Sequence, residues 1–112
     1  TLETAAEIAY THHEKWDGTG YPQGLAGENI PLSGRIVSIA DTYDALRSIR
    51  PYKHPFSHEE SSMWIKKAAG KAFDPDLVLA FEKVEHKMEE IFDNQYDPKL
   101  AEAILKNSLE TQ

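Results

Sequence analysis

The chain has 112 residues, of which 40% are apolar and 28% charged, a composition and size that fit one globular domain. Its formal net charge of −7 argues against a general binder of nucleic acid polymers, and the absence of cysteine excludes disulfides and thiolate metal ligands. No apolar run reaches the ~18 residues of a membrane span and no signal-peptide pattern is present, so a cytoplasmic location is expected.

Capping signals and apolar spacing predict an all-α fold of about five helices joined by long loops. Helix starts are expected at Thr1 or Thr4, at Pro31, at Ser57 and at Asp74. The predicted helical ranges are 2–13, 31–48, 57–70, from 75 through at least 91, and from 98 onward.

The stretch from His12 to Pro22 holds more potential chemistry than any other of similar length. It spans the end of the first predicted helix and the start of a loop, residues 14–30, that contains four of the six glycines. Loops of this length are usually functional or disordered, and the aromatic and proline content here favours function. Besides its two histidines, the motif comprises Glu14, Asp17, Gly18, Gly20, Tyr21 and Pro22.

His12 and His13 are adjacent, which restricts how they can bind a metal. Consecutive side chains on a helix diverge by about 100°, so the pair cannot easily chelate one ion from one face. The arrangement suits two metals, or one ligand and a supporting partner. The alternative is a solvated helix end whose histidines interact favourably with the helix dipole.

The second predicted helix carries Asp41 within a wide apolar stripe, so this helix is expected to be largely buried. A buried carboxylate is costly unless it is paired or bound to metal. Asp44 lies three residues further on and shares the same face. Asp41 is therefore either a metal ligand supported by Asp44, or a carboxylate paired with Arg47 or Arg35.

A basic segment follows that helix. Arg50 offers a planar fork that suits phosphate, and Lys53 offers a mobile point charge. With Arg47 and His54 they form a local positive cluster in an acidic chain. A bare segment of this kind is more often a solvated loop, so both interpretations stay open.

The chain after residue 75 is interpreted as structural or as an interaction surface. The third helix is expected to place Met63, Trp64 and Ala68 in the core. His86 lies among glutamates on the fourth helix and is interpreted as solvated rather than as a metal ligand. An apolar stripe with alternating intervals of four and three residues runs along the fourth helix: Leu77, Phe81, Val84, Met88 and Ile91.

Taken together, these motifs resemble the HD-GYP domain. No histidine precedes an aspartate, so the His-Asp dipeptide of that family is absent. The resemblance implies that residues 1–92 are the C-terminal part of such a domain and that residues 93–112 form a C-terminal helix with a structural or interaction role. The likeness covers roughly residues 3–81 and rests on the stretch from His12 to Pro22, Tyr43-Asp44-Ala45-Leu46, Arg50-Pro51-Tyr52-Lys53 and Phe73-Asp74-Pro75.

HD-GYP domains are all-α, metal-dependent phosphodiesterases that hydrolyse the bacterial second messenger cyclic di-GMP. The resemblance implies two or three divalent ions, often iron or manganese, and makes His12, His13 and Asp41 metal ligands and catalytic residues. The implied partners are cyclic di-GMP or a related cyclic dinucleotide, the missing N-terminal half-domain, and a sensory or receiver domain in signal transduction. The implied substrate-binding residues are Tyr21, Asp44, Arg50 and Lys53.

Three protein ligands cannot saturate two ions that prefer octahedral shells. We therefore expect the intact parent protein to be a phosphodiesterase and this chain alone to be inactive. The alternative is a non-catalytic module that serves as a binding or dimerisation surface in signalling. Because the first two helices would normally pack against absent ones, the chain is also expected to self-associate, swap helices or use its tail helices as cover.

Overall fold

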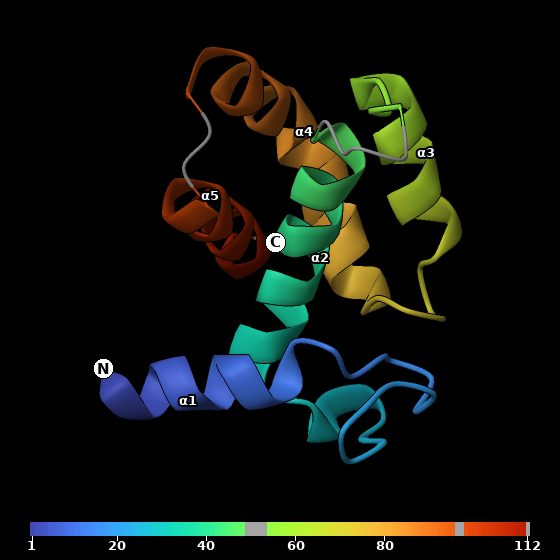
Figure 1. The fold of residues 1–112 in the computed structure, drawn as a ribbon, viewed down its shortest axis with the longest axis vertical. Coiled ribbons are helices and arrows are strands. Elements are labelled where there is room, and N and C mark those ends of the chain that lie inside the picture. Colours follow the sequence, from blue (N-terminus) through green and yellow to red (C-terminus); the bar gives the residue numbers. More distant parts are fainter. Residues whose placement is uncertain (49–53, 96–97, 112) are drawn as a thin grey trace.

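The computed structural model describes residues 1–48, 54–95 and 98–111, and it confirms the predicted all-α fold. Within that part of the chain the only β-type pairing is an isolated bridge between Ala69 and Phe73. Helix α2 lies at the centre, with α3 on one side and α5 on the other, and α1 crosses near the start of α2 (Figure 1). The helices are α1 (Leu2–Thr11), the short 3-10 helix η1 (Gly27–Asn29), α2 (Leu32–Arg47), α3 (His58–Lys67), α4 (Pro75–Gln95) and α5 (Pro98–Glu110).

The helix starts follow the predicted caps. The Thr1 side chain accepts a hydrogen bond from the backbone N–H of Thr4, and Ser57 forms a complete capping box with Glu60. Two helix ends differ from the prediction: α1 ends at Thr11, and α3 ends at Lys67 rather than near residue 70. The 3-10 helix in the long loop was not predicted.

The core lies where α2, α4 and α5 meet. The predicted stripe on α4 is confirmed as far as Met88, because Leu77, Phe81 and Met88 are fully buried and Val84 packs partly against them. At its end Phe92, rather than the predicted Ile91, packs against the core. Helix α5 packs on α4 and α2, so the predicted division at residues 92 and 93 falls inside α4, and the tail helix shares the core. His86 is exposed, as predicted.

The predicted core face of α3 is wrong for Met63 and Trp64, although Ala68 does pack partly against the core. Met63 is 56% exposed and Trp64 is 53% exposed. The buried positions of this helix are instead His58, Ser61, Ser62 and Ile65. Polar partners on α4 decide this orientation, and they turn the larger apolar side chains outward.

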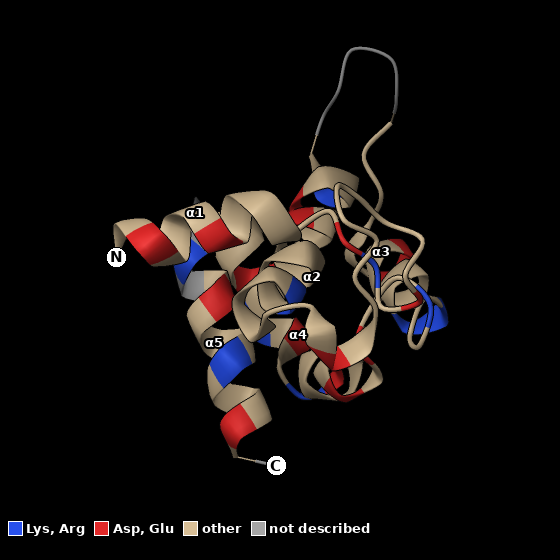
Figure 2. Cartoon of the chain, turned by 90° about the horizontal axis from the view of Figure 1, so that it is seen from below, with Lys and Arg blue, Asp and Glu red and all other residues tan. Residues whose placement is uncertain are grey.

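Helix α2 is well covered within this chain, whereas α1 is not. Side chains along α1 are exposed apart from Ile8 and Thr11, and Leu2 is 87% exposed. Thr11 packs against Gly34, where an added Cβ would clash with the threonine side chain. The expectation that the tail helices cover the second helix is confirmed, because α5 packs on α2, whereas the apolar side of α1 stays uncovered. Acidic residues are spread along α1, α4 and α5 (Figure 2).

Tyr43 is fully buried at the centre of the fold. Its hydroxyl accepts a hydrogen bond from Arg47 Nη1 at 2.7 Å and lies 2.9 Å from Nδ1 of His58. Burial raises the pKa of Tyr43 to about 12. Arg47 also pairs with Asp93 on α4 at 2.8 Å, so it stabilises the contact between two helices and does not belong to the predicted anion-binding cluster.

Glu85 ends this buried polar chain. Its carboxylate lies 3.1 Å from Nε2 of His58 and accepts hydrogen bonds from Ser62 and Lys66, each at 2.8 Å. Burial acts to raise the pKa of Glu85, but the hydrogen bonds from Lys66, Ser62 and His58 outweigh it and lower the pKa below its ordinary value. With the His58 proton on Nε2, each group donates to the next, from Arg47 through Tyr43 and His58 to Glu85.

No helix in the described part of the chain is long and apolar enough to cross a membrane.

We predict that Glu85→Gln destabilises the fold by about 1–3 kcal/mol near neutral pH, because it weakens hydrogen bonds to a charged acceptor. The folded-state pKa lies below the ordinary value of 4.5, so the ionised carboxylate contributes stability above that pH. This contribution is lost as the pH falls through the lower, folded-state pKa, and the difference between wild type and variant should shrink there. Urea unfolding at several pH values measures it.

The matched control is Glu82→Gln, which changes an exposed carboxylate on the same helix. It should change the free energy of unfolding by less than about 0.5 kcal/mol. An equal loss in both variants would show that the buried polar chain contributes nothing special.

Candidate active site

The loop after α1 is organised around Glu14, which is only 2% exposed. One carboxylate oxygen accepts a hydrogen bond from the backbone N–H of Gln23 at 2.8 Å, and the other accepts from Leu25 at 2.9 Å. A buried carboxylate with two backbone donors is well satisfied. Glu14 therefore holds the far side of the loop against its start.

The glycines of the loop are required by its geometry. Gly18 has φ +83°, a conformation that other residues rarely adopt. A Cβ on Gly20 would clash with the carbonyl of His13 and the backbone nitrogen of Lys15. The peptide bond between Tyr21 and Pro22 is cis. These motif residues shape the loop.

Asp17 shapes the same turn. It accepts hydrogen bonds from the hydroxyl of Thr19 at 2.6 Å and from its backbone N–H at 3.0 Å. These bonds lower the pKa of Asp17.

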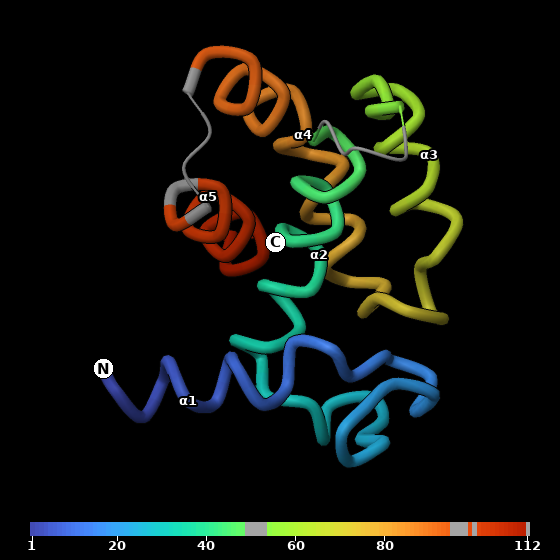
Figure 3. Tube along the Cα trace, in the orientation of Figure 1, coloured from blue at the N-terminus to red at the C-terminus, as the bar shows by residue number. Residues whose placement is uncertain are grey.

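The loop is attached to the segment between α3 and α4. The backbone N–H of Trp16 donates to Ala72 at 3.1 Å, and that of Asp17 donates to Lys71 at 2.9 Å. The trace shows the turn after α3 extending toward this loop (Figure 3). Segments more than fifty residues apart in the sequence thus form one continuous surface.

Arg35 reinforces this attachment from α2. Its guanidinium pairs with Asp74 at 2.7 Å, with both side chains largely buried, and its Nε donates to the carbonyl of Ile30 at 2.8 Å. It also lies over the ring of Trp16, 6.0 Å from the ring centroid. One side chain therefore connects the loop, α2 and the start of α4.

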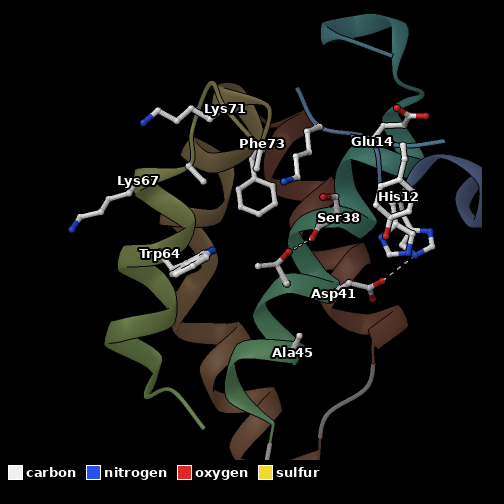
Figure 4. Close-up of a pocket in the computed structure, with 15 residues that line it drawn as sticks. His12, Glu14, Ser38, Asp41, Ala45, Trp64, Lys67, Lys71 and Phe73 are labelled. Carbon is white, nitrogen blue, oxygen red and sulfur yellow. Dashed lines mark hydrogen bonds and ion pairs between the residues drawn. The ribbon is translucent and has the colours of Figure 1, made fainter. Parts of the chain in front are cut away.

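A pocket of about 770 Å³ lies beside this junction (Figure 4). Its volume falls within the range of about 300–1,000 Å³ that is usual for small-molecule sites. One wall comes from the end of α1 and from α2, and the other comes from α3 and the turn that follows it. The lining residues are His12, His13, Glu14, Lys15, Tyr21, Ser38, Asp41, Thr42, Ala45, Trp64, Lys67, Ala68, Lys71, Ala72 and Phe73.

His12 and Asp41 face each other in this pocket (Figure 4), with 3.8 Å between Nε2 and Oδ2. Nδ1 of His12 lies 2.8 Å from the carbonyl of Ile8, which caps α1 and orients the ring. Nε2 is the ring nitrogen directed toward Asp41. The helix-end interpretation and the ligand interpretation of His12 are thus compatible, because they use different nitrogens.

Asp41 is not the buried carboxylate that the sequence led us to expect. Its side chain is 54% exposed, and it pairs with neither Arg35 nor Arg47, which form ion pairs with Asp74 and Asp93. The carboxylate is therefore oriented toward the pocket without a cationic partner from α2 to hold it.

His13 and Tyr21 form an aromatic pair within the same lining. Their rings stack with centroids 5.0 Å apart at 16°, and Tyr21 is 60% exposed. The backbone N–H of Tyr21 donates to the carbonyl of His13, and this hydrogen bond keeps the two residues next to each other. Both predicted site residues thus reach the pocket.

One other predicted site residue is not brought into it. Asp44 does not line the pocket, and its carboxylate accepts a hydrogen bond from Ser48 at 3.2 Å. Arg50 and Lys53 lie outside the described residues. Glu14 does line the pocket, although its carboxylate oxygens are occupied by the loop backbone.

The pocket holds only part of a metal-binding donor set within the described residues. Within residues 1–48, 54–95 and 98–111, no group of three His, Cys, Asp or Glu side chains lies close enough to hold an ion. His12 and Asp41 supply an imidazole nitrogen and a carboxylate oxygen on one wall, which is a suitable but incomplete set.

Sequence reasoning missed the wall formed by α3. Trp64 was assigned to the core on the basis of its residue type, whereas the spacing of His58, Ser61, Ser62 and Ile65 marks the buried face of this helix. A helical projection that starts from the capping box would have placed Trp64 off that face.

Comparison with known proteins shows which family the chain belongs to. The HD domain family matches residues 1–77, more than half of the chain. The chain belongs to the HD domain family. All of the site residues that line the pocket fall within the matched range of this HD domain.

Curated relatives of this HD domain chain act on cyclic dinucleotides, according to their names. A cyclic di-GMP phosphodiesterase of Vibrio cholerae is 58% identical over 86 residues, which cover 77% of this chain and 18% of the relative. One of Thermotoga maritima is 47% identical over 96 residues, covering 86% of this chain and 26% of the relative. A 3'3'-cGAMP-specific phosphodiesterase of Vibrio cholerae is 51% identical over 77 residues, covering 69% of this chain and 15% of the relative.

The chain therefore spans about a quarter or less of the length of these relatives.

We predict that Glu14→Gln destabilises the protein by about 1–3 kcal/mol, because one amide N–H₂ would face a backbone donor in a buried site. Glu28→Gln, an exposed change in the same loop, should have an effect below about 0.5 kcal/mol. Urea unfolding of both variants measures the difference. Equal stability of the two would mean that Glu14 does not hold the loop.

Proposed function

We propose that this chain is part of an HD-GYP domain that hydrolyses cyclic di-GMP or a closely related cyclic dinucleotide. The observation that carries the proposal is the pocket in which His12 and His13, from the turn that ends α1, meet Asp41 from α2. The names of the relatives support the same reaction class. In this proposal residues 1–92 belong to the HD-GYP domain, and residues 93–112, which include the end of α4 and α5, have a structural or interaction role.

His12, His13 and Asp41 are the residues that would hold divalent metal, and further ligands would come from outside the described residues. We propose two or three ions, with iron or manganese preferred. Such ions, when bound, lower the pKa of a coordinated water and polarise the phosphodiester. The other steps belong to the protein itself.

The residues of the chain position the reactants. The carbonyl of Ile8 holds His12 so that Nε2 points toward Asp41. Lys15 lines the pocket and supplies positive charge for a phosphate. We propose that Tyr21, Arg50 and Lys53 contact the substrate and that Asp44 supports this wall from the next turn of α2.

A second candidate is a non-catalytic binding or dimerisation module. The incomplete set of metal ligands in the described residues is the observation that favours it. The uncovered side of α1 would then be the contact surface, for a second copy of the chain or for the N-terminal half-domain. A cytoplasmic location and an attached sensory or receiver domain are part of both proposals.

We predict that the full-length protein containing this chain binds about two metal ions and hydrolyses cyclic di-GMP, while the 112-residue chain alone does not. In the full-length protein, His12→Ala and Asp41→Asn should each lower hydrolysis by more than the ~10–100-fold that loss of a supporting contact costs. Metal content by elemental analysis, measured alongside hydrolysis, should fall in both variants.

His86→Ala removes an exposed histidine of α4 and is the matched control. It should leave both metal content and rate unchanged. Full metal content in the Asp41→Asn protein, or an unaltered rate, would contradict the assignment. A full-length protein that binds dinucleotide but no metal would support the module instead.

A further inference from the structure

The wall of the pocket opposite His12 and Asp41 carries an exposed indole. Trp64 is 53% exposed, and its ring extends from α3 into the cavity (Figure 4). It contributes little to the core, whose α3 contacts come from the other face of the helix. An exposed tryptophan inside a pocket of this family therefore needs an explanation other than packing.

The indole is held in place rather than loose. Phe56 meets it at 69° with ring centroids 6.2 Å apart, an edge-type contact. The backbone N–H of Phe56 donates to the carbonyl of Leu46 at 2.7 Å, which fixes this segment to the end of α2. The contact with Phe56 therefore restrains the Trp64 ring on one side.

The pocket is larger than a phosphodiester requires. A phosphate at the wall formed by His12 and Asp41 would occupy a small part of about 770 Å³. The remaining lining on the α3 side is mostly apolar and includes Ala68, Ala72 and Phe73. A flat, uncharged and aromatic group fits this surface better than a second charged group does.

Charge at the rim fits the same ligand. Lys67 follows Trp64 by three residues on α3, and Lys71 lies on the turn beyond it. Both residues line the pocket at the α3 wall, and their side chains extend outward from the cavity to its exposed edge (Figure 4). In a chain of net charge −7, lysines beside this aromatic wall favour an anion that carries a ring system.

We propose that Trp64 stacks on a nucleobase of the substrate and makes the α3 wall a base subsite. This inference rests on the proposed function, because it assigns the part of the cyclic dinucleotide that lies away from the hydrolysed phosphodiester. Every base presents a π-face, so the subsite accepts guanine and adenine alike. The subsite therefore favours cyclic dinucleotides over simple phosphodiesters.

The test measures cyclic di-GMP hydrolysis and equilibrium binding with the full-length protein. Trp64→Ala should raise KM and Kd for cyclic di-GMP by about 5- to 150-fold, the range expected for loss of one base–aromatic stack, and leave kcat nearly unchanged. Trp64→Phe should recover most of the affinity. Competitive inhibition by guanosine 5'-monophosphate should weaken in Trp64→Ala, while inhibition by ribose 5-phosphate, which lacks a base, should not.

Met63→Ala is the matched control, since Met63 is the adjacent residue, is 56% exposed and does not line the main pocket. It should leave KM unchanged. Thermal melting of Trp64→Ala near the wild-type temperature establishes that the fold is intact.

The outcomes separate the two proposals. Hydrolysis by wild type with an unchanged KM in Trp64→Ala, or an equal rise in Met63→Ala, overturns the base subsite and leaves the proposed function standing. Binding without hydrolysis that weakens in Trp64→Ala supports the subsite and counts against the proposed reaction. A wild-type protein that neither binds nor cleaves cyclic dinucleotides overturns both.

Discussion

The ion pair between Arg35 and Asp74 is the interaction on which the site geometry depends. It connects α2 to the start of α4, and the same guanidinium reaches the carbonyl of Ile30 at the end of the long loop. Because both side chains are largely buried, loss of one partner would leave the other charge without compensation. The loop and the turn after α3 are thereby held side by side, and the two walls of the pocket keep their separation.

Local signals predicted much of the fold. The caps at Thr1 and Ser57 mark helix starts because they satisfy backbone donors that have no partner within the helix. The apolar spacing along α4 predicted its core-facing side, because residues three and four apart lie on one face of a helix. Trp64 was misplaced because partners distant in sequence decide the orientation of α3: His58 and Ser62 both reach Glu85, and this polar contact overrides apolar residue type.

The candidate site was predictable in its members more than in its geometry. The resemblance indicated His12, His13 and Asp41, and the structure places all three in one pocket. It could not show that His12 uses Nδ1 for the helix end and presents Nε2 to the pocket, or that Asp41 is half exposed. Those features arise from the crossing of α1 over α2, which depends on packing between Thr11 and Gly34.

The central claim is that the wall formed by His12 and Asp41 is the metal side of a dinucleotide pocket. The most direct measurement is a crystal structure of the full-length protein with Mn²⁺, in which anomalous scattering locates the ions. The account predicts an ion within about 2.5 Å of His12 Nε2 and of an Asp41 carboxylate oxygen. Manganese bound only elsewhere, with these two side chains unligated, would contradict it.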